Sequence, residues 1–371
     1  MSRPRLTTDR LRLEPLAPEH AELLVAMNED PAVMRFITGE PFARERTLRS
    51  LPTWVADQDG LGFWAGFVET PPAGEEFVGV WCLERDPEGD GAAELSYRLP
   101  RHSWGRGLAT EGATAVLSHG FDTIGLQRVW AETMALNAAS RAVLERLGMT
   151  YERSLPGEPP TEGWEQGEVV YGVDRAAWTR IATARRWDAE AAVFDSAADH
   201  GLHDPDVRAA WRELLLATLP PPPARVADLG CGTGTLSLLL TDEGYNVAGV
   251  DVSPAMVERA VAKRGERLTP TFVVGDAATP PLEGPFDVVL CRHVLWALPG
   301  PPAALRRWGD LLAPDGRLVL IEGHWSTGAG LTAAQTLALL RTNGRRGVVR
   351  HLPEPAYWGR EITDERYVVT G

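Results

Sequence analysis

The sequence has little of what marks metal-binding, disulfide-rich or membrane-spanning proteins. It contains three cysteines in 371 residues, Cys82, Cys231 and Cys291, and none of them stands in CxxC spacing. This scarcity argues against a metal site and a disulfide framework, so we expect a reduced, cytoplasmic setting. The longest apolar runs are far too short to span a membrane, and the first residues lack the apolar core of a secretory signal. We therefore expect neither a metal nor a membrane partner.

Basic residues are also in the minority. Lys and Arg together number 37 against 51 Asp and Glu, which gives a formal net charge of −14. A surface of this sign repels polyanions, so nucleic acid is not an expected partner. The charge instead suits basic or small-molecule acceptors. The length of 371 residues indicates about two domains, and no internal repeat is present.

Residues 1–180 predict a domain whose strands mostly follow one another through turns. Apolar and polar residues alternate where strands are expected, and turn-forming segments such as DPEGDG at 86–91 separate them. This order predicts an α+β domain with a mixed, mostly antiparallel sheet. The expected strands are 8–16, 63–68, 76–83, 93–99, 128–133 and 168–173, and the expected helices are 17–28, 110–122 and 140–147.

Residues 181–371 predict a second domain in which strands and helices alternate. This β–α rhythm predicts a doubly wound, mainly parallel sheet. The junction is expected near 178–186, and the four prolines at 220–223 are interpreted as a stiff lead-in to the first strand. The expected strands are 224–228, 245–251, 271–274, 286–291 and 316–322, and the expected helices are 208–219, 233–243, 254–263 and 302–312.

The second domain begins its first βα unit with a glycine-rich loop, DLGCGTG at 228–234. Glycines there allow a tight turn close to a ligand, and the following helix contributes free N–H groups. The spacing is GxGxG, whereas dinucleotide-binding folds use GxGxxG. Asp251 ends the next strand, 17 residues after Gly234, where a carboxylate can bind both hydroxyls of a ribose.

Two further segments follow in order, GDA at 275–277 and FDVVLCRHVLWAL at 286–298. Together these motifs, over about 187–371, resemble the class I S-adenosylmethionine-dependent methyltransferases. The resemblance implies a Rossmann-like sheet of seven strands with an antiparallel last strand, and it includes a closing strand at 366–370. It also implies S-adenosylmethionine as the cofactor. The implied cofactor-binding residues are Gly230, Gly232 and Gly234 at the methionine side, Asp228 near the ammonium, Asp251 at the ribose, Asp276 and Ala277 at the adenine, and Arg292 near the sulfonium.

The methyl acceptor is less well defined by the sequence. The donor is already activated, so a base is needed only if the acceptor is protonated. His293, His200 and His203 are candidate bases, although each could instead be a structural hydrogen-bonding residue. Trp296 and Trp187 could line an acceptor pocket or belong to the core. Cys231 is expected to be a small packing residue. The alternatives are an NAD-linked oxidoreductase, which the GxGxG spacing disfavours, and a domain that binds no ligand.

The first domain has a glycine loop of its own, HSWGRGLAT at 102–110, after the strand ELSYRL. Unlike the second domain, the first domain has no acidic residue at the end of a second parallel strand. A further segment, NAAS, follows the loop at 137–140. With TDRLRLEPL at 8–16 and GEVVYGVDRAAW at 167–178, these motifs resemble the GNAT N-acetyltransferases over about 5–178. The branch that acetylates ribosomal-protein N-termini, with its drug- and small-amine-acetylating relatives, looks nearest. The family pattern Q/R-x-x-G-x-G/A has His102 in its first place.

This second resemblance implies acetyl-CoA as the cofactor, with backbone N–H groups of the loop turned toward its pyrophosphate. Arg106 could add charge there or be solvated. A backbone N–H of a splayed strand at 94–99 would polarise the thioester carbonyl. Asn137 would bind the pantetheine arm or order its loop. The implied cofactor-binding residues are His102, Gly105, Arg106, Gly107, Ala109, Thr110 and Asn137.

The resemblance also implies catalytic residues in the first domain. Ser140 would be the general acid for the leaving thiolate, or else a helix N-cap. Glu94 matches an acidic strand position in relatives and could be the base. Three other acidic residues stand before the last strand, where some relatives carry a carboxylate: Glu158, Glu162 and Glu165. Glu111 is expected to occupy the first turn of a helix, and Trp104 is expected to be a packing residue.

The sequence therefore predicts a bifunctional transferase. One domain would transfer acetyl to an amine, on a protein N-terminus or a small molecule, and the other would transfer methyl to a small-molecule acceptor. The alternative is that one domain is catalytic and the other is a cofactor-binding sensor or scaffold.

Overall fold

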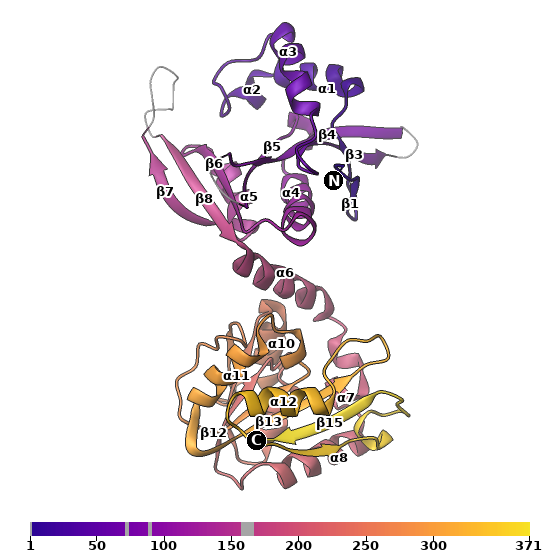
Figure 1. Cartoon of the computed structure of the whole chain (residues 1–371), viewed down its shortest axis with the longest axis vertical. Helices are drawn as coiled ribbons and strands as arrows, with labels where there is room; N and C mark the ends of the chain where they lie inside the picture. Colours follow the sequence, from indigo (N-terminus) through magenta and orange to yellow (C-terminus); the bar gives the residue numbers. More distant parts are fainter. Residues whose placement is uncertain (1, 71–73, 88–90, 157–166) are drawn as a thin grey trace. The chain divides into compact units, whose positions relative to one another are not determined.

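The computed structural model describes residues 2–70, 74–87, 91–156 and 167–371. The chain divides into two compact units, Met1–Thr179 and Arg180–Gly371 (Figure 1). Within the described residues, no helix is long and apolar enough to cross a membrane. Glu158, Glu162 and Glu165 lie outside the described residues.

The first unit is built on an eight-stranded sheet with the order β1-β2-β3-β4-β5-β6-β8-β7. Among the described strand pairs, β5 with β6 is parallel and the others are antiparallel. The prediction of a mixed, mostly antiparallel sheet is confirmed. The strands are β1 (Leu6–Thr7), β2 (Arg12–Pro15), β3 (Gly62–Thr70), β4 (Gly74–Arg85), β5 (Ala92–Arg98), β6 (Arg128–Met134), β7 (Thr150–Leu155) and β8 (Glu168–Asp174).

Strands β5 and β6 separate halfway along their length. Their pairing covers Ala92 to Glu94, whereas on its other side β5 stays paired with β4 as far as Arg98. The backbone edge of residues 95–98 is therefore not paired with β6. This is the splayed strand that the sequence predicts, and it opens the sheet beside the glycine loop.

The helices of the first unit include two that the sequence did not predict, α2 and α3, and strand β7 was also missed. The strand expected at 8–16 is wrong as a single element, because Thr8 N and Leu11 O close a turn at 2.9 Å that separates β1 from β2. The helices are α1 (Ala21–Asn28), α2 (Pro31–Met34), α3 (Arg44–Val55), α4 (Leu108–Ser118) with the π-helical turn His119–Ile124, and α5 (Ala138–Arg146).

The second unit is a seven-stranded sheet with the order β11-β10-β9-β12-β13-β15-β14. Strands β9 to β13 pair in parallel and β15 is antiparallel to its neighbours, so the predicted doubly wound sheet is confirmed. The strands are β9 (Arg225–Leu229), β10 (Asn246–Asp251), β11 (Thr271–Val274), β12 (Phe286–Arg292), β13 (Leu312–His324), β14 (Val348–His351) and β15 (Glu365–Thr370).

Successive residues of the central strands face opposite sides of this sheet, and helices cover both faces. Val288 and Leu290 of β12 belong to one buried cluster, with side chains of α8 and α9, whereas Val289 and Cys291 belong to a second, with side chains of α11 and α12. The sequence did not predict α6, α7, α12 or β14. The helices are α6 (Arg175–Glu190), which includes the expected junction, α7 (Ala198–Gly201), α8 (Pro205–Thr218), α9 (Thr235–Asp242), α10 (Pro254–Arg264), α11 (Pro301–Asp310) and α12 (Ala333–Thr342).

Candidate active sites

The glycine loop of the first unit leads into an uncapped helix. Gly107 is the N-cap of α4, with φ +78° and no side-chain hydrogen bond to the helix. Gly105 has φ +71°, and a Cβ added there would meet no atom within 4 Å. These left-handed conformations explain why glycine stands at both positions. Ala109 and Thr110 lie in the first turn of α4, whose N–H groups have no intrahelical acceptor and can receive an anion.

The two basic side chains of this loop are already engaged. Arg106 Nη1 lies 3.0 Å from Glu76 Oε2, and His102 Nε2 lies 3.4 Å from Glu76 Oε1. Arg10, which the sequence did not single out, donates through Nη1 to the Arg106 carbonyl at 3.0 Å. Trp104 is 50% exposed, so its expected packing role is wrong; its indole N–H donates to the Leu99 carbonyl at 2.8 Å.

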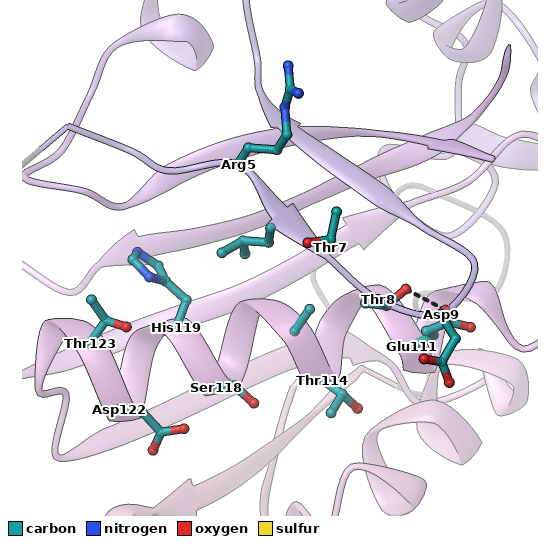
Figure 2. A pocket seen from close by; sticks show the side chains of 12 residues that line it. Arg5, Thr7, Thr8, Asp9, Glu111, Thr114, Ser118, His119, Asp122 and Thr123 are labelled. Atoms are coloured by element: carbon teal, nitrogen blue, oxygen red, sulfur yellow. Dashed lines mark hydrogen bonds between the residues drawn. The ribbon is translucent and has the colours of Figure 1, made fainter. Parts of the chain in front are cut away.

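A hollow of about 700 Å³ is lined by residues of β1 and α4 (Figure 2). Its lining includes Glu111, which lies in the first turn of α4 as expected. Figure 2 shows Thr8 donating to Glu111, at 2.5 Å, and Arg10 Nε donates to the same carboxylate at 2.7 Å. Glu111 therefore fixes the turn between β1 and β2. None of the predicted acetyl-site residues lines this hollow.

A second cavity, of about 380 Å³, lies where β5 and β6 separate, and it brings together Glu94, Asn137 and Ser140. Ser140 Oγ lies 2.9 Å from Tyr97 Oη. The Ser140 backbone N–H donates to Asn137 Oδ1 at 3.1 Å, so Asn137 is the N-cap of α5. The alternative interpretation of Ser140 as the N-cap is therefore wrong, and its hydroxyl faces Tyr97 instead.

Three carboxyl groups meet in this cavity: Glu94 of β5, Glu132 of β6 and Glu168 of β8. Burial, and next the neighbouring Glu132, raise the pKa of Glu94 to about 7. A hydrogen bond with Glu132, together with burial, raises the pKa of Glu168 to about 7. The sequence did not indicate Glu132 and Glu168, because neither belongs to a recognisable motif. They come together only when β6 pairs with β8, a strand that follows much later in the chain.

The cavity also contains two partly buried side chains of β5. Burial raises the pKa of Tyr97 to about 12, so its phenol stays protonated at neutral pH. Arg98 donates through Nη1 to Asn28 Oδ1 at 2.5 Å, and burial lowers its pKa to about 10. No sequence motif indicated either residue.

The glycine loop of the second unit is held close to its neighbours. Gly230, Gly232 and Gly234 all have positive φ, between +54° and +78°. A Cβ on Gly234 would lie 2.6 Å from the Phe272 ring, and one on Gly232 would lie 3.2 Å from the ring of Phe194. Glycine is therefore required by both conformation and space. Gly234 is also the N-cap of α9 without a side-chain hydrogen bond, which leaves the first N–H groups of α9 without an intrahelical acceptor.

Two buried aspartates lie against this loop. Asp251 accepts from Gly232 N at 2.8 Å and from Ser253 N at 2.9 Å, so it joins the glycine loop to the start of α10. Asp228 Oδ2 accepts from Ser237 Oγ at 2.6 Å. Burial raises the pKa of Asp228 to about 6 and also raises that of Asp251. Both carboxylates lie at the carboxyl ends of parallel strands, where doubly wound sheets bind ligands.

The adenine-side candidates lie beside Asp251. Gly275 N donates to the Asp251 carbonyl at 2.8 Å. Asp276 Oδ1 accepts from Ala278 N at 2.8 Å, and the Ala277 carbonyl accepts from Trp308 at 2.7 Å. The structure thus brings the predicted ribose and adenine residues to one edge of the sheet.

His293 lies beyond the end of β12 and is partly buried. It has φ +60°, a strained conformation for a non-glycine residue. Its ring lies 5.3 Å from that of Trp325 and 6.2 Å from that of Trp358. Its Nε2 atom is buried without a hydrogen-bond partner. Burial, and next the Arg292 and Arg366 charges, lower its pKa well below 6.5, so the ring is neutral at physiological pH.

The other predicted side chains of this region make contacts within the protein. Arg292 Nη1 donates to the Asp199 carbonyl at 2.6 Å, and its guanidinium lies 5.2 Å from the Trp211 ring centre. Trp296 donates to the His293 carbonyl at 3.0 Å. His200 stacks on Phe194 at 4.3 Å, next to the glycine loop, and Trp187 meets the same ring edge-on at 6.1 Å. Burial places Cys231 in the core and raises its pKa well above 9, as expected for a packing residue. His203 has no hydrogen bond or ion pair in the described part of the chain.

Two buried charged groups near His293 were missed. Glu322 of β13 accepts from Leu295 N at 2.9 Å, and burial raises its pKa to about 8. Arg366 of β15 lies with its guanidinium 4.8 Å from the Trp325 ring centre and 5.2 Å from that of Trp358. The one sequence signal was the acidic residue at the end of the apolar strand GRLVLIEG. In the part of the chain that the structure describes, no group of three or more His, Cys, Asp or Glu side chains could hold a metal.

The comparisons with known proteins match the two halves of the chain to two different families. Residues 10–150 match the family model "Acetyltransferase (GNAT) domain", and residues 203–351 match the model "Methyltransferase domain". The chain is 34% identical over 204 residues to the FsC-acetyl coenzyme A-N(2)-transacetylase of Aspergillus fumigatus, covering 50% of this chain and 84% of that protein. An acetyltransferase structure from Agrobacterium tumefaciens is 26% identical, with a TM-score of 0.38, and covers 47% of this chain and 95% of its own.

The second half is similar to methyltransferases over part of their length. The Trans-aconitate 2-methyltransferase of Streptomyces avermitilis is 37% identical over 117 residues, covering 29% of this chain and 43% of that protein. GNAT domains use acetyl-CoA, and class I methyltransferases use S-adenosylmethionine. The chain belongs to the GNAT acetyltransferase family through its first half and carries a methyltransferase domain in its second half.

Proposed function

We propose that the first domain, residues 1–180, transfers acetyl from acetyl-CoA to an amine. The observation that carries this proposal is the cavity at the β5–β6 opening, which joins the Ser140 hydroxyl to an acidic group at Glu94. The uncapped start of α4 and the open space at Gly105 fit a pyrophosphate at the loop that contains His102, Arg106, Gly107, Ala109 and Thr110. Asn137 holds the α5 end of the cavity.

The residues of the cavity divide the proton transfers between them. Glu94 accepts a proton from the acceptor ammonium, which frees the nitrogen lone pair to form the C–N bond with the acetyl carbon. An unpaired N–H of residues 95–98 polarises the acetyl carbonyl. As the C–S bond breaks, Ser140 donates its hydroxyl proton to the departing sulfur, and the second proton that the amine nitrogen loses restores the Ser140 hydroxyl. Tyr97, which contacts Ser140 Oγ, orients that hydroxyl and acts as a positioning residue.

We further propose that the second domain, residues 181–371, transfers methyl from S-adenosylmethionine to a small-molecule acceptor. The observation that supports this is the meeting of Asp228, Asp251 and the positive-φ glycine loop at the carboxyl ends of β9 and β10. Asp251 would hold the ribose, Asp276 and Ala277 would hold the adenine, and Arg292 would lie near the sulfonium end. His293, neutral and with an unpartnered Nε2, is placed to accept an acceptor proton.

Calorimetry on the full chain tests both proposals together. We expect acetyl-CoA and S-adenosylmethionine each to bind with one site per chain, and neither to displace the other. Release of the CoA thiol with a panel of amines then measures acetyl transfer, and incorporation of labelled methyl groups measures methyl transfer. Binding of neither donor would contradict the whole proposal. Turnover with one donor and binding without turnover of the other would support the alternative in which one domain is a sensor or scaffold.

A further inference from the structure

The cavity at the β5–β6 opening contains a partly buried cation without an anionic partner. Arg98 lines it, and the hydrogen bond that Nη1 makes goes to the neutral amide of Asn28. Asn28 is itself buried and donates to Thr47 Oγ1 at 3.2 Å. Arg98 Nε is buried without a hydrogen-bond partner, and none of the ion pairs within the described ranges includes Arg98. A partly buried charge in this state has lost hydration without gaining an anion, which a ligand can supply.

Acidic side chains line another part of the same cavity. Glu94 stands four residues before Arg98 on β5, about 13 Å away along an extended strand, and it faces the same side of the sheet. Glu132 and Glu168 join Glu94 there, and all four side chains line the cavity. The cavity is therefore dipolar, with a guanidinium toward one end and three carboxyl groups toward the other.

This arrangement is more than an amine site requires. Acidic groups alone would suffice to attract an ammonium group and take its proton. A partly buried arginine beside them would repel a simple diamine, whereas a planar guanidinium suits a carboxylate, which it binds through two parallel hydrogen bonds. A volume of about 380 Å³ accommodates a ligand of amino-acid size or somewhat larger.

We propose that the acetyl acceptor is an amino acid or a close derivative, whose carboxylate binds Arg98 and whose amine points to Glu94, Glu132 and Glu168. The inference rests on the proposed acetyl transfer and names the substrate class of that site. In the reaction, the amine nitrogen bonds to the acetyl carbon, the C–S bond breaks, and the acceptor carboxylate keeps its charge throughout. Arg98 thus determines specificity and takes no part in the proton transfers.

Substrate pairs that differ only in a carboxylate test this assignment on the full chain. Ornithine against putrescine, lysine against cadaverine and tyrosine against tyramine are suitable pairs. We expect kcat/KM to favour the carboxylated member of at least one pair by tenfold or more, on the order of what a buried charge-assisted hydrogen bond provides. Equal or better acetylation of the decarboxylated member in every pair, or a preference for a peptide N-terminus, would overturn the inference while leaving acetyl transfer intact.

Variants at Arg98 supply the second test. Arg98→Met should bring the ratio of kcat/KM within each pair close to one, and Arg98→Lys should recover part of the preference. Arg49→Met, at an exposed position of α3, is the matched control and should leave the ratio unchanged. Retention of the preference in Arg98→Met would overturn the inference. If Arg98→Met does not fold, the kcat/KM ratios of the wild-type protein with the substrate pairs still test the inference.

Binding separates this inference from the proposed function. Calorimetry with CoA present should show the amino acid binding to wild type and, at least tenfold more weakly, to Arg98→Met, with the acetyl-CoA affinity the same in both. A protein that binds no acetyl-CoA and acetylates no amine would contradict the proposed function itself. A protein that binds acetyl-CoA and shows no difference in amino-acid affinity between wild type and Arg98→Met would contradict only the role of Arg98.

Discussion

The Tyr97 hydroxyl lies 2.9 Å from the Ser140 hydroxyl, across the opening between β5 and α5. Tyr97 comes from the strand edge that β6 leaves unpaired, and Ser140 comes from the first turn of the helix that Asn137 caps. Because burial raises the pKa of Tyr97 to about 12, the phenol remains a donor throughout the physiological range. The pair therefore presents a fixed hydroxyl at the place where we propose that the thiolate departs.

Ser140→Ala should lower kcat for acetyl transfer by roughly 10²-fold or more, the usual contribution of a general acid. Tyr97→Phe should lower it by a smaller factor, since it removes only the group that orients Ser140. Both variants should bind acetyl-CoA as wild type does. Ser154→Ala, which removes an exposed hydroxyl on β7, is the control. Full activity in Ser140→Ala would leave its hydroxyl without a chemical role.

The acidic cluster predicts a pH dependence for acetyl transfer. Glu94 acts as a base only when ionised, and its pKa is raised to about 7, so activity should rise as the pH increases through 7. Glu132→Gln removes the nearest like charge, which lowers the pKa of Glu94 and moves this rise to lower pH. Glu152→Gln, on β7 and paired with Arg128, should not move it. A profile of kcat/KM between pH 5 and 9 measures the shift, and an unchanged midpoint in Glu132→Gln would contradict the assignment of Glu94.

Glu322 predicts a pH dependence of stability in the second domain. Its folded-state pKa, about 8, lies above the value of 4.5 for an ordinary glutamate. As pH rises from about 4.5 to 8, the unfolded chain releases this proton and the folded chain retains it, so stability decreases across that window. Glu322→Gln keeps the acceptor for Leu295 N and has no proton to lose.

Thermal melts at pH 5, 6.5 and 8 measure this effect. Wild type should lose more of its Tm between pH 5 and 8 than Glu322→Gln does, and the variant should be the more stable protein at pH 8. Parallel curves for the two proteins would mean that Glu322 ionises as freely in the folded chain as in the unfolded one.

If the two cofactors bind at separate sites, a substitution in one glycine loop should weaken the binding of one cofactor only. A tryptophan at Gly107 would occupy the start of α4, and one at Gly232 would meet Phe194 and disturb the bond to Asp251. Gly107→Trp should weaken acetyl-CoA binding at least tenfold without changing S-adenosylmethionine binding, and Gly232→Trp should do the reverse. Calorimetry with each donor measures this, and circular dichroism checks that each variant is folded. Loss of both ligands from a folded variant would contradict independent sites.

The sequence predicted those parts of the sites that lie in contiguous motifs. Both glycine loops stand where they were expected, because glycine spacing encodes positive φ locally, and Asp251 follows from the end of a strand in a βαβ unit. Glu132 and Glu168 could not be predicted, since they meet only through the antiparallel pairing of β6 with β8. Arg98 and Arg366 resemble ordinary strand residues until the sheet order is known. The turn that divides β1 from β2 likewise depends on Glu111, about 100 residues away.

His293 offers a test that needs no methyl acceptor. The His293 ring is partly shielded from water and lies close to Arg292 and Arg366, and both effects oppose its protonation and lower its pKa well below 6.5. The ring should therefore stay neutral at pH values where exposed histidines have become charged. NMR of histidine side chains, with His293→Asn to assign the signal, should show no change for His293 between pH 8 and 5.5. His351, which is exposed, provides the comparison within the same domain. Titration of His293 near pH 6.5 would contradict its burial and its place as a neutral base.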